Sequence, residues 1–229
     1  MPQPYESRLV RALLVQTAAT GLIDAVSYLA LGHVFTANMT GNIVFLAFAI
    51  AGAPGLSIPR SAVSLAAFLA GAVAGGRLAA RRGTGPQARW VATAFSVEAV
   101  LLLSAALGAS AATRAPLVAV YGIILLTALA MGVRNATVRT IALPDLTTTV
   151  LTLTLTGLAA DSALAGGTSP RAGRRWASVL SMFVGAGVGA LLVRRSLALP
   201  LLVSSVTSSS CAIAVALTLR AGHAPTARA

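Results

Sequence analysis

The sequence has very few charged residues for its length, and this scarcity decides the class of protein. Only 10 % of its 229 residues are charged, whereas 57 % are hydrophobic. So few charges cannot cover the water-exposed surface of a soluble domain of this size. The mean hydropathy of +0.86 agrees with the composition. The sequence therefore predicts an integral membrane protein, with the lipid bilayer as its surroundings.

Cysteine and lysine are also scarce. Cys211 is the only cysteine, so the chain can form no internal disulfide and contains no CxxC redox or metal motif. It also has no HExxH motif, no Ser-His pair and no carboxylate dyad at helical spacing, so we expect no enzyme, no metal and no cofactor. All 17 basic residues are arginine. Together with the abundance of alanine and glycine, the absence of lysine is typical of a bacterial genome rich in G and C.

The strong positive charge has an explanation other than nucleic-acid binding. The formal net charge is +12, because five acidic residues stand against 17 arginines. The arginines are concentrated in short stretches at the ends of apolar segments, where positive charge sets the orientation of membrane helices. We therefore expect no nucleic-acid partner.

Long apolar segments occupy most of the chain and leave no room for a soluble domain. Hydropathy resolves eight of them, near residues 9–31, 36–53, 60–80, 88–108, 115–133, 146–165, 175–193 and 198–220. Residues 1–229 are thus predicted to form one transmembrane domain of the all-α polytopic class.

The second half of the chain repeats short patterns of the first half. The matching pairs are Gly21-x-x-Asp24-Ala25 with Gly132-x-x-Asn135-Ala136, Met39-Thr40 with Leu151-Thr152, and Gly71-x-x-x-Gly75 with Gly185-x-x-x-Gly189. Their offsets are 111, 112 and 114 residues. Ordered matches at a nearly constant offset indicate two repeats of about 112 residues, one near 1–112 and the other near 113–229.

The distribution of arginines favours six membrane spans over eight. If all eight segments cross the membrane, nine arginines lie on the side of the N-terminus and eight on the other, which is no bias. If segments 36–53 and 146–165 instead enter and leave on one face, the count becomes thirteen against four. The positive-inside rule prefers this second arrangement, with both termini cytoplasmic. Each repeat then has three spans and one short re-entrant or broken helix, and the repeats have opposite orientations.

Asp24 lies inside the first apolar segment and is the leading functional candidate. An aspartate at the centre of a membrane helix costs roughly 2.5–3.5 kcal/mol on insertion scales, so such residues usually mark a site. A neutral aspartate that hydrogen-bonds between helices is the structural alternative. Asp24 opposite Arg134 or Arg139 would form a buried ion pair. Glu98, near one end of its segment, is expected to reach the lipid headgroups.

Polar residues around the two short segments form a candidate pathway for a solute or ion. If the repeats face one another, the residues that meet are Asp24, Ser27, Tyr28, Asn38, Thr40, Asn42, Arg134, Asn135, Arg139, Thr148, Thr149 and Thr152. Such amide and hydroxyl side chains suit a hydrated solute, although they can equally be bonds between helices. Four glycines at GxxxG spacing are expected to line close helix contacts: Gly71, Gly75, Gly185 and Gly189.

The stretch around Asp24 resembles the signature of the YoaK-type family of small bacterial inner-membrane proteins. That signature is G-x-x-D-A-x-S-Y-L followed by V-F-x-A-N-M-T-G-N, and here it spans Gly21 to Leu29 and Val34 to Asn42. The family's second block resembles Q-N-A followed by T-T-V-M-T-G. This chain has Arg134-Asn135-Ala136 and Thr148-Thr149-Val150-Leu151-Thr152-Leu153 instead. The resemblance implies a bacterial inner-membrane protein and assigns it no activity.

Two functions from different classes follow from these patterns. The first is a secondary transporter or facilitator for a small polar or anionic solute, with Asp24 as a protonatable coupling site. The second is a non-transporting membrane protein that acts as an assembly or interaction partner, in which the polar cluster only joins helices. The solute, the coupling ion and the oligomeric state stay open.

Overall fold

All regular structure in the described residues is helical. The computed structural model describes residues 4–81, 87–110, 116–146 and 148–221. In chain order the elements are α1 (Pro4–Ala30), α2 (Met39–Ile50), α3 (Ile58–Ala80), α4 (Gln87–Ser110), α5 (Pro116–Ile141), α6 (Thr152–Ala160), a 3₁₀ turn η1 (Ala163–Ala165), α7 (Ala172–Val193) and α8 (Ala198–Ala221). The predicted all-α class is confirmed.

Six of the described helices are long and apolar enough to cross a membrane: α1, α3, α4, α5, α7 and α8. Helix α2 has 12 residues and α6 has 9. At about 1.5 Å per residue these two reach at most about 18 Å, which is short of a hydrocarbon core of about 30 Å. The helix lengths therefore agree with six spans and not with eight.

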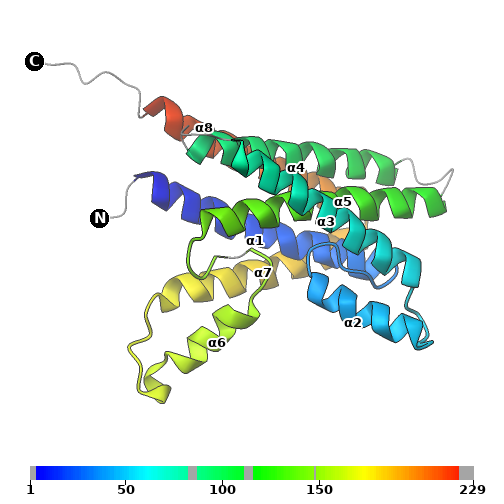
Figure 1. Ribbon diagram of the computed structural model, residues 1–229, viewed down its shortest axis with the longest axis horizontal. Helices are drawn as coiled ribbons and strands as arrows, with labels where there is room; N and C mark the ends of the chain where they lie inside the picture. The colour runs from blue at the N-terminus through cyan, green and yellow to red at the C-terminus, as the bar shows by residue number, and fades with distance from the viewer. Residues whose placement is uncertain (1–3, 82–86, 111–115, 147, 222–229) are drawn as a thin grey trace, which may run out of the picture.

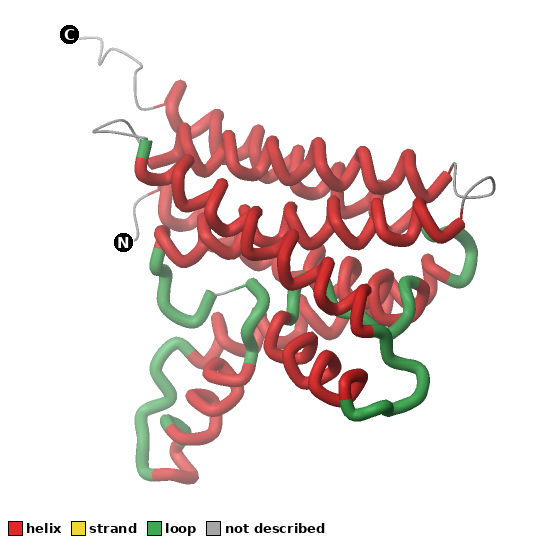
Figure 2. Tube along the Cα trace, turned by 45° about the vertical axis from the view of Figure 1, so that its right-hand side comes forward, coloured by secondary structure: helices red, strands yellow, loops and turns green. Residues whose placement is uncertain are grey.

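The long helices form a bundle of side-by-side pairs (Figure 1). The largest contacts join α3 to α5, α4 to α8 and α1 to α7. Two further contacts, α4 with α5 and α1 with α8, connect these pairs into one body. Helix α2 packs on α3, and α6 packs on α7. Figure 2 shows both short helices projecting from the same side of the bundle.

Two of these pairs, α3–α5 and α1–α7, are close because glycines face the backbone of the partner helix. A Cβ atom at Gly71 would clash with the backbone of Leu129, and one at Gly185 would clash with the backbone of Ala18. Without side chains at these positions the helix axes can approach and gain dispersion contacts along their length.

The next glycine in each pattern shows the direction of packing. Gly75 faces Val133 and Gly189 faces Leu22, one turn further along both helices of each pair. The two helices of the α3–α5 pair therefore run in the same direction, and so do those of the α1–α7 pair. All four predicted glycines lie at such contacts.

The two short helices lie at different ends of the bundle, and one of these ends also carries the chain termini. The start of α1 and the end of α8 lie at one end of the bundle (Figure 1). Helix α6 lies near that end, and α2 lies near the opposite one. The two helix breaks are therefore far apart along the bundle.

Candidate functional site

A buried ion pair joins Arg134 of α5 to Glu98 of α4. Both side chains have no exposed surface. Arg134 Nε donates to Glu98 Oε2 at 3.0 Å, and Nη2 donates to Oε1. The two parallel hydrogen bonds are the strong, bidentate geometry of arginine with a carboxylate.

Two other helices complete the surroundings of this ion pair. Arg134 Nη1 donates to the carbonyl oxygen of Gln16 at 2.9 Å and to the hydroxyl of Thr20 at 2.7 Å, both on α1. Ser208 of α8 donates its hydroxyl hydrogen to Glu98 Oε1. Glu98 lies at the middle of α4, so four helices meet at a charged centre halfway along the bundle.

The partners of both charges differ from the expectations. Glu98 does not reach the headgroups, because its position at mid-helix faces α5 and α8 and not lipid. The ion pair that Asp24 would form with Arg134 or Arg139 is absent among the described residues, and Glu98 binds the guanidinium of Arg134. The signal for this pair was present in the sequence as two ionisable residues in apolar segments, but no spacing rule joins positions 36 residues apart.

Asp24 lies on α1 one turn beyond Thr20. Its Oδ1 atom is buried, and within the described part of the chain it has no hydrogen-bond partner. The backbone N–H of Ala37 lies close to the carboxyl group. Ser27 donates to the backbone carbonyl of Asp24 at 3.2 Å and not to its side chain. Asp24 therefore carries a carboxyl group that no cation pairs with among the described residues.

Asn42 anchors the chain segment that follows α1. The backbone N–H of Phe35 donates to Asn42 Oδ1 at 2.9 Å, and Asn42 Nδ2 donates to the Ser64 hydroxyl at 3.1 Å. Ser64 in turn donates to the Phe35 carbonyl at 2.6 Å. The ring of Tyr28 stacks on Phe35 with centroids 5.2 Å apart. These contacts fix α2 and α3 to the end of α1, which is a structural task.

Two predicted residues of the first repeat are exposed. Asn38 caps α2, accepting a hydrogen bond from the backbone N–H of Gly41 at 3.4 Å, and Thr40 lies in the first turn of the same helix.

The predicted residues of the second repeat gather near the end of α5. Thr149 donates to Asn135 Oδ1 at 2.6 Å, and Asn135 Nδ2 donates to the Met131 carbonyl at 2.8 Å. Both side chains line a pocket of about 860 Å³ between α3, α5 and the segment before α6, which Arg139 also lines. Thr148 is buried, and Thr152 is exposed at the start of α6.

The predicted pathway residues thus form two groups and a centre, not one continuous lining. Asp24, Ser27 and Tyr28 lie in the last turns of α1 and Asn42 lies in α2, whereas Asn135 and Arg139 lie in the last turns of α5 and Thr149 precedes α6. Helices α2 and α6 lie near opposite ends of the bundle (Figure 1). Arg134 precedes Asn135 on α5, and its guanidinium reaches Glu98 at the middle of α4. The groups are apart because the two helix breaks lie at opposite ends of the bundle.

A second charged cluster ties α6 and the preceding segment to α7. Arg171 Nε and Arg175 Nε donate to the two oxygens of Asp145 at 2.6 and 2.9 Å. Arg175 Nη1 also donates to Asp161 Oδ2 at 2.7 Å and to the Gly157 carbonyl at 2.6 Å, at the end of α6. Arg174 lies 3.4 Å from Asp145. Burial raises the pKa of Asp145, but the hydrogen bonds from Arg171 and Arg175 outweigh it and hold the pKa below its ordinary value.

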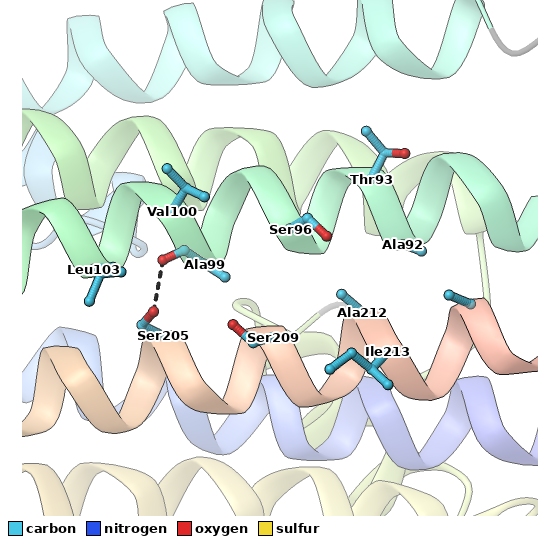
Figure 3. A pocket seen from close by; sticks show the side chains of 11 residues that line it. Ala92, Thr93, Ser96, Ala99, Val100, Leu103, Ser205, Ser209, Ala212 and Ile213 are labelled. Atoms are coloured by element: carbon cyan, nitrogen blue, oxygen red, sulfur yellow. Dashed lines mark hydrogen bonds between the residues drawn. The ribbon is translucent and has the colours of Figure 1, made fainter.

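A separate pocket of about 550 Å³ lies between α4 and α8 (Figure 3). Alanine, serine and threonine make up most of its lining, together with Val100, Leu103 and Ile213. Ser205 of α8 donates to the carbonyl of Ala99 of α4 at 2.8 Å. Within the described residues no three histidine, cysteine, aspartate or glutamate side chains gather as metal ligands would.

Six apolar spans around a buried polar centre define a multi-pass helical membrane protein. The chain belongs to the family described as "Protein of unknown function (DUF1275)", which matches residues 12–216. It is 34 % identical over 157 residues to the UPF0700 transmembrane protein YoaK of Bacillus subtilis (strain 168), covering 69 % of this chain and 67 % of that protein. The YoaK-type resemblance of the sequence is confirmed. No solved structure matches the chain.

Proposed function

We propose that the protein is a secondary transporter or facilitator for a small polar or anionic solute in a bacterial inner membrane. The observation that carries the proposal is the Arg134–Glu98 pair, which has no exposed surface and lies midway along membrane-spanning helices. Ionisable residues at such depth are costly, and in membrane proteins they mark solute and ion pathways.

We further propose that the two halves are inverted repeats, and the helix contacts support this. Under the repeat, α1 corresponds to α5, α3 to α7 and α4 to α8. The contact of α1 with α7 then corresponds to that of α5 with α3, and the contact of α1 with α8 to that of α5 with α4. Gly21 meets the backbone of α7 as Gly132 meets the backbone of α3. Inverted repeats with a broken helix in each half are a recurrent transporter plan.

The positions of the polar groups support a pathway with a barrier at its centre. Asp24 follows Thr20, a partner of Arg134, along α1 and away from the end where α1 begins, whereas Asn135 follows Arg134 along α5 towards that end. A solute that crosses between α1 and α5 meets the hydrogen bonds of Arg134 to α1, which must open to let it pass. An anion can replace Glu98 as a partner of Arg134 during that step, because both are acceptors of the same guanidinium donors.

Asp24 is proposed to couple protons to this movement. A carboxyl group that no cation holds in its charged form can bind and release a proton, whereas the carboxylate of Glu98 is paired with Arg134. Asp24→Asn keeps the shape of the side chain and removes its charge, and the matching position in the second half is already Asn135. The variant should fold, lose solute accumulation against a gradient and retain exchange at equilibrium.

The test uses purified protein in liposomes that contain a pH-sensitive dye, with a panel of small carboxylates, amides and phosphates supplied outside. A solute that moves protons in wild-type liposomes and not in Asp24→Asn liposomes supports the proposal. Normal proton movement in the Asp24→Asn variant removes Asp24 from the mechanism.

A non-transporting assembly partner is the second candidate, and one observation favours it. Arg134 uses four of its five N–H groups in hydrogen bonds within the protein. A network with its hydrogen bonds satisfied in this way is sufficient to join helices and needs no solute to explain it. If no solute of the panel enters liposomes that contain the wild-type protein or the Asp24→Asn variant, this second function explains the structure better.

A further inference from the structure

The 860 Å³ pocket beside α3 and α5 has an apolar wall and a charged end, and the transport proposal assigns neither a role. One wall is the stripe of Phe68, Ala72 and Gly76, which lie four residues apart on α3. This stripe runs for about 12 Å along the helix, at 1.5 Å per residue. Further apolar side chains of the lining are Val138, Leu143, Pro144, Leu146 and Val150.

The polar groups of this pocket are all at one end. Helices α3 and α5 run in the same direction, with Gly71 facing Leu129 and Gly75 facing Val133. Phe68 lies near the middle of α3, whereas Arg139 lies in the last turn of α5, beyond the contact of Gly75 with Val133. Helices α3 and α5 both end at the end of the bundle that carries the termini (Figure 1). The pocket is apolar in its depth and cationic at its mouth.

The charge at the mouth is not neutralised by the protein. Arg139 is exposed, and no acidic side chain of the described residues lies within ion-pair distance of it. Asp145 lines the same pocket, but Arg171, Arg174 and Arg175 bind its carboxylate. Four arginines thus stand against two aspartates, Asp145 and Asp161, at this end of α5 and α7.

We propose that this pocket binds one anionic phospholipid of the leaflet at the end with the termini. The acyl chain lies along the α3 stripe, and Arg139 binds the headgroup phosphate. The volume of about 860 Å³ is within the range of ligand pockets, about 300–1,000 Å³. Basic pockets between membrane helices bind anionic headgroups by this combination of an apolar wall and a cationic rim. The site does not depend on whether the protein transports a solute.

Gly76 permits a test that fills the pocket without disturbing the fold. A Cβ atom at Gly76 would meet nothing within 4 Å, so Gly76→Leu places its side chain in the open pocket. Gly187 on α7 is equally open and does not line this pocket, so Gly187→Leu is the matched control. Arg139→Gln removes the charge, and Arg89→Gln removes an exposed arginine of α4 outside the pocket.

The experiment counts lipids bound to the purified full chain by native mass spectrometry, with dioleoylphosphatidylglycerol or dioleoylphosphatidylcholine added to the detergent. We expect the wild-type chain to retain phosphatidylglycerol in preference to phosphatidylcholine. Gly76→Leu and Arg139→Gln should each retain one phosphatidylglycerol fewer, whereas Gly187→Leu and Arg89→Gln should match the wild type. Equal retention by all five proteins overturns the proposal.

Free glycerol 1-phosphate separates a lipid from a water-soluble anion. It should not displace the bound phosphatidylglycerol at equal concentration, because it lacks the acyl chain that fills the stripe. Displacement by glycerol 1-phosphate would mean that the pocket takes a soluble phosphate, and the lipid proposal would fail.

Discussion

A fully buried charge is stable in a protein only if a partner of opposite charge offsets its lost hydration. Two hydrogen bonds join Arg134 to Glu98, and each has a further partner: Arg134 donates to Thr20, and Glu98 accepts from Ser208. Their mutual attraction offsets the loss of hydration, but either charge alone in the same place would have no such compensation. The pair is therefore a coupled unit at the residue scale.

Removing one partner should consequently cost more than removing both. We expect Arg134→Gln or Glu98→Gln to lower the free energy of unfolding by about 3–5 kcal/mol, because each leaves a buried charge unpaired. The double variant Glu98→Leu with Arg134→Met should be more stable than the sum of the single effects predicts. Unfolding in mixed micelles, measured as a double-mutant cycle, gives the coupling energy. Additive effects would contradict the coupling.

Asp145 should make stability depend on pH at acid values. Its folded pKa is lower than its ordinary value of 3.8, since Arg171 and Arg175 favour the carboxylate. A carboxyl group with a depressed pKa contributes stability above its ordinary pKa and loses that contribution as the pH falls through the folded value. Wild-type protein should melt at a higher temperature than Asp145→Asn near neutral pH, and the difference should shrink below pH 3.8. A difference that stays constant down to the acid range would rule out this linkage.

How well the site could be predicted differs from residue to residue. Asp24 could be recognised from the sequence, because a carboxylate in an apolar segment is unusual whatever it contacts. The role of Glu98 was not recognisable, since its partner lies on another helix and helical spacing relates only near neighbours. Asn42 belongs to a motif, yet its hydrogen bonds to Phe35 and Ser64 form only when α3 packs against α2 and the segment that follows α1.

At the scale of helices, hydropathy predicts which segments are helical and how long they are, but not how the helices are arranged in the bundle. The six long apolar helices and the two short ones correspond to the predicted segments. What hydropathy could not predict is that α2 and α6 lie at opposite ends of the bundle, because burial in lipid and burial in protein select the same side chains. The repeat, read from glycine and aspartate spacing, stays a proposal that the contacts support.

The packing of α7 on α1 offers a prediction with a control inside one helix. A Cβ atom at Gly185 would clash with the backbone of Ala18, whereas one at Gly187 meets nothing within 4 Å. Gly185→Leu should force the helices apart and lower the melting temperature and folded yield sharply, since backbone cannot move aside as a side chain can. Gly187→Leu should behave as the wild type in both measurements. Equal behaviour of the two variants would mean that α1 and α7 are not in contact.

At the scale of the whole molecule, an even number of spans places both termini on one side of the membrane. The start of α1 and the end of α8 lie at the same end of the bundle, as six spans require (Figure 1). The sequence assigns thirteen arginines to that side and four to the other. The structure takes Arg134 out of this count because its side chain is buried at mid-bundle, yet twelve against four remains a strong bias.

We therefore expect both termini to face the cytoplasm. Cysteines placed at Tyr5, Ser196 and Thr226, in a chain with Cys211→Ala, report on the two sides of the membrane. In intact cells a membrane-impermeant maleimide should label Ser196→Cys, between α7 and α8, and leave the two terminal positions unlabelled. All three should be labelled after the cells are opened, which controls for reactivity. Labelling of only one terminus in intact cells would require an odd number of spans, and labelling of both would reverse the orientation that the arginines predict.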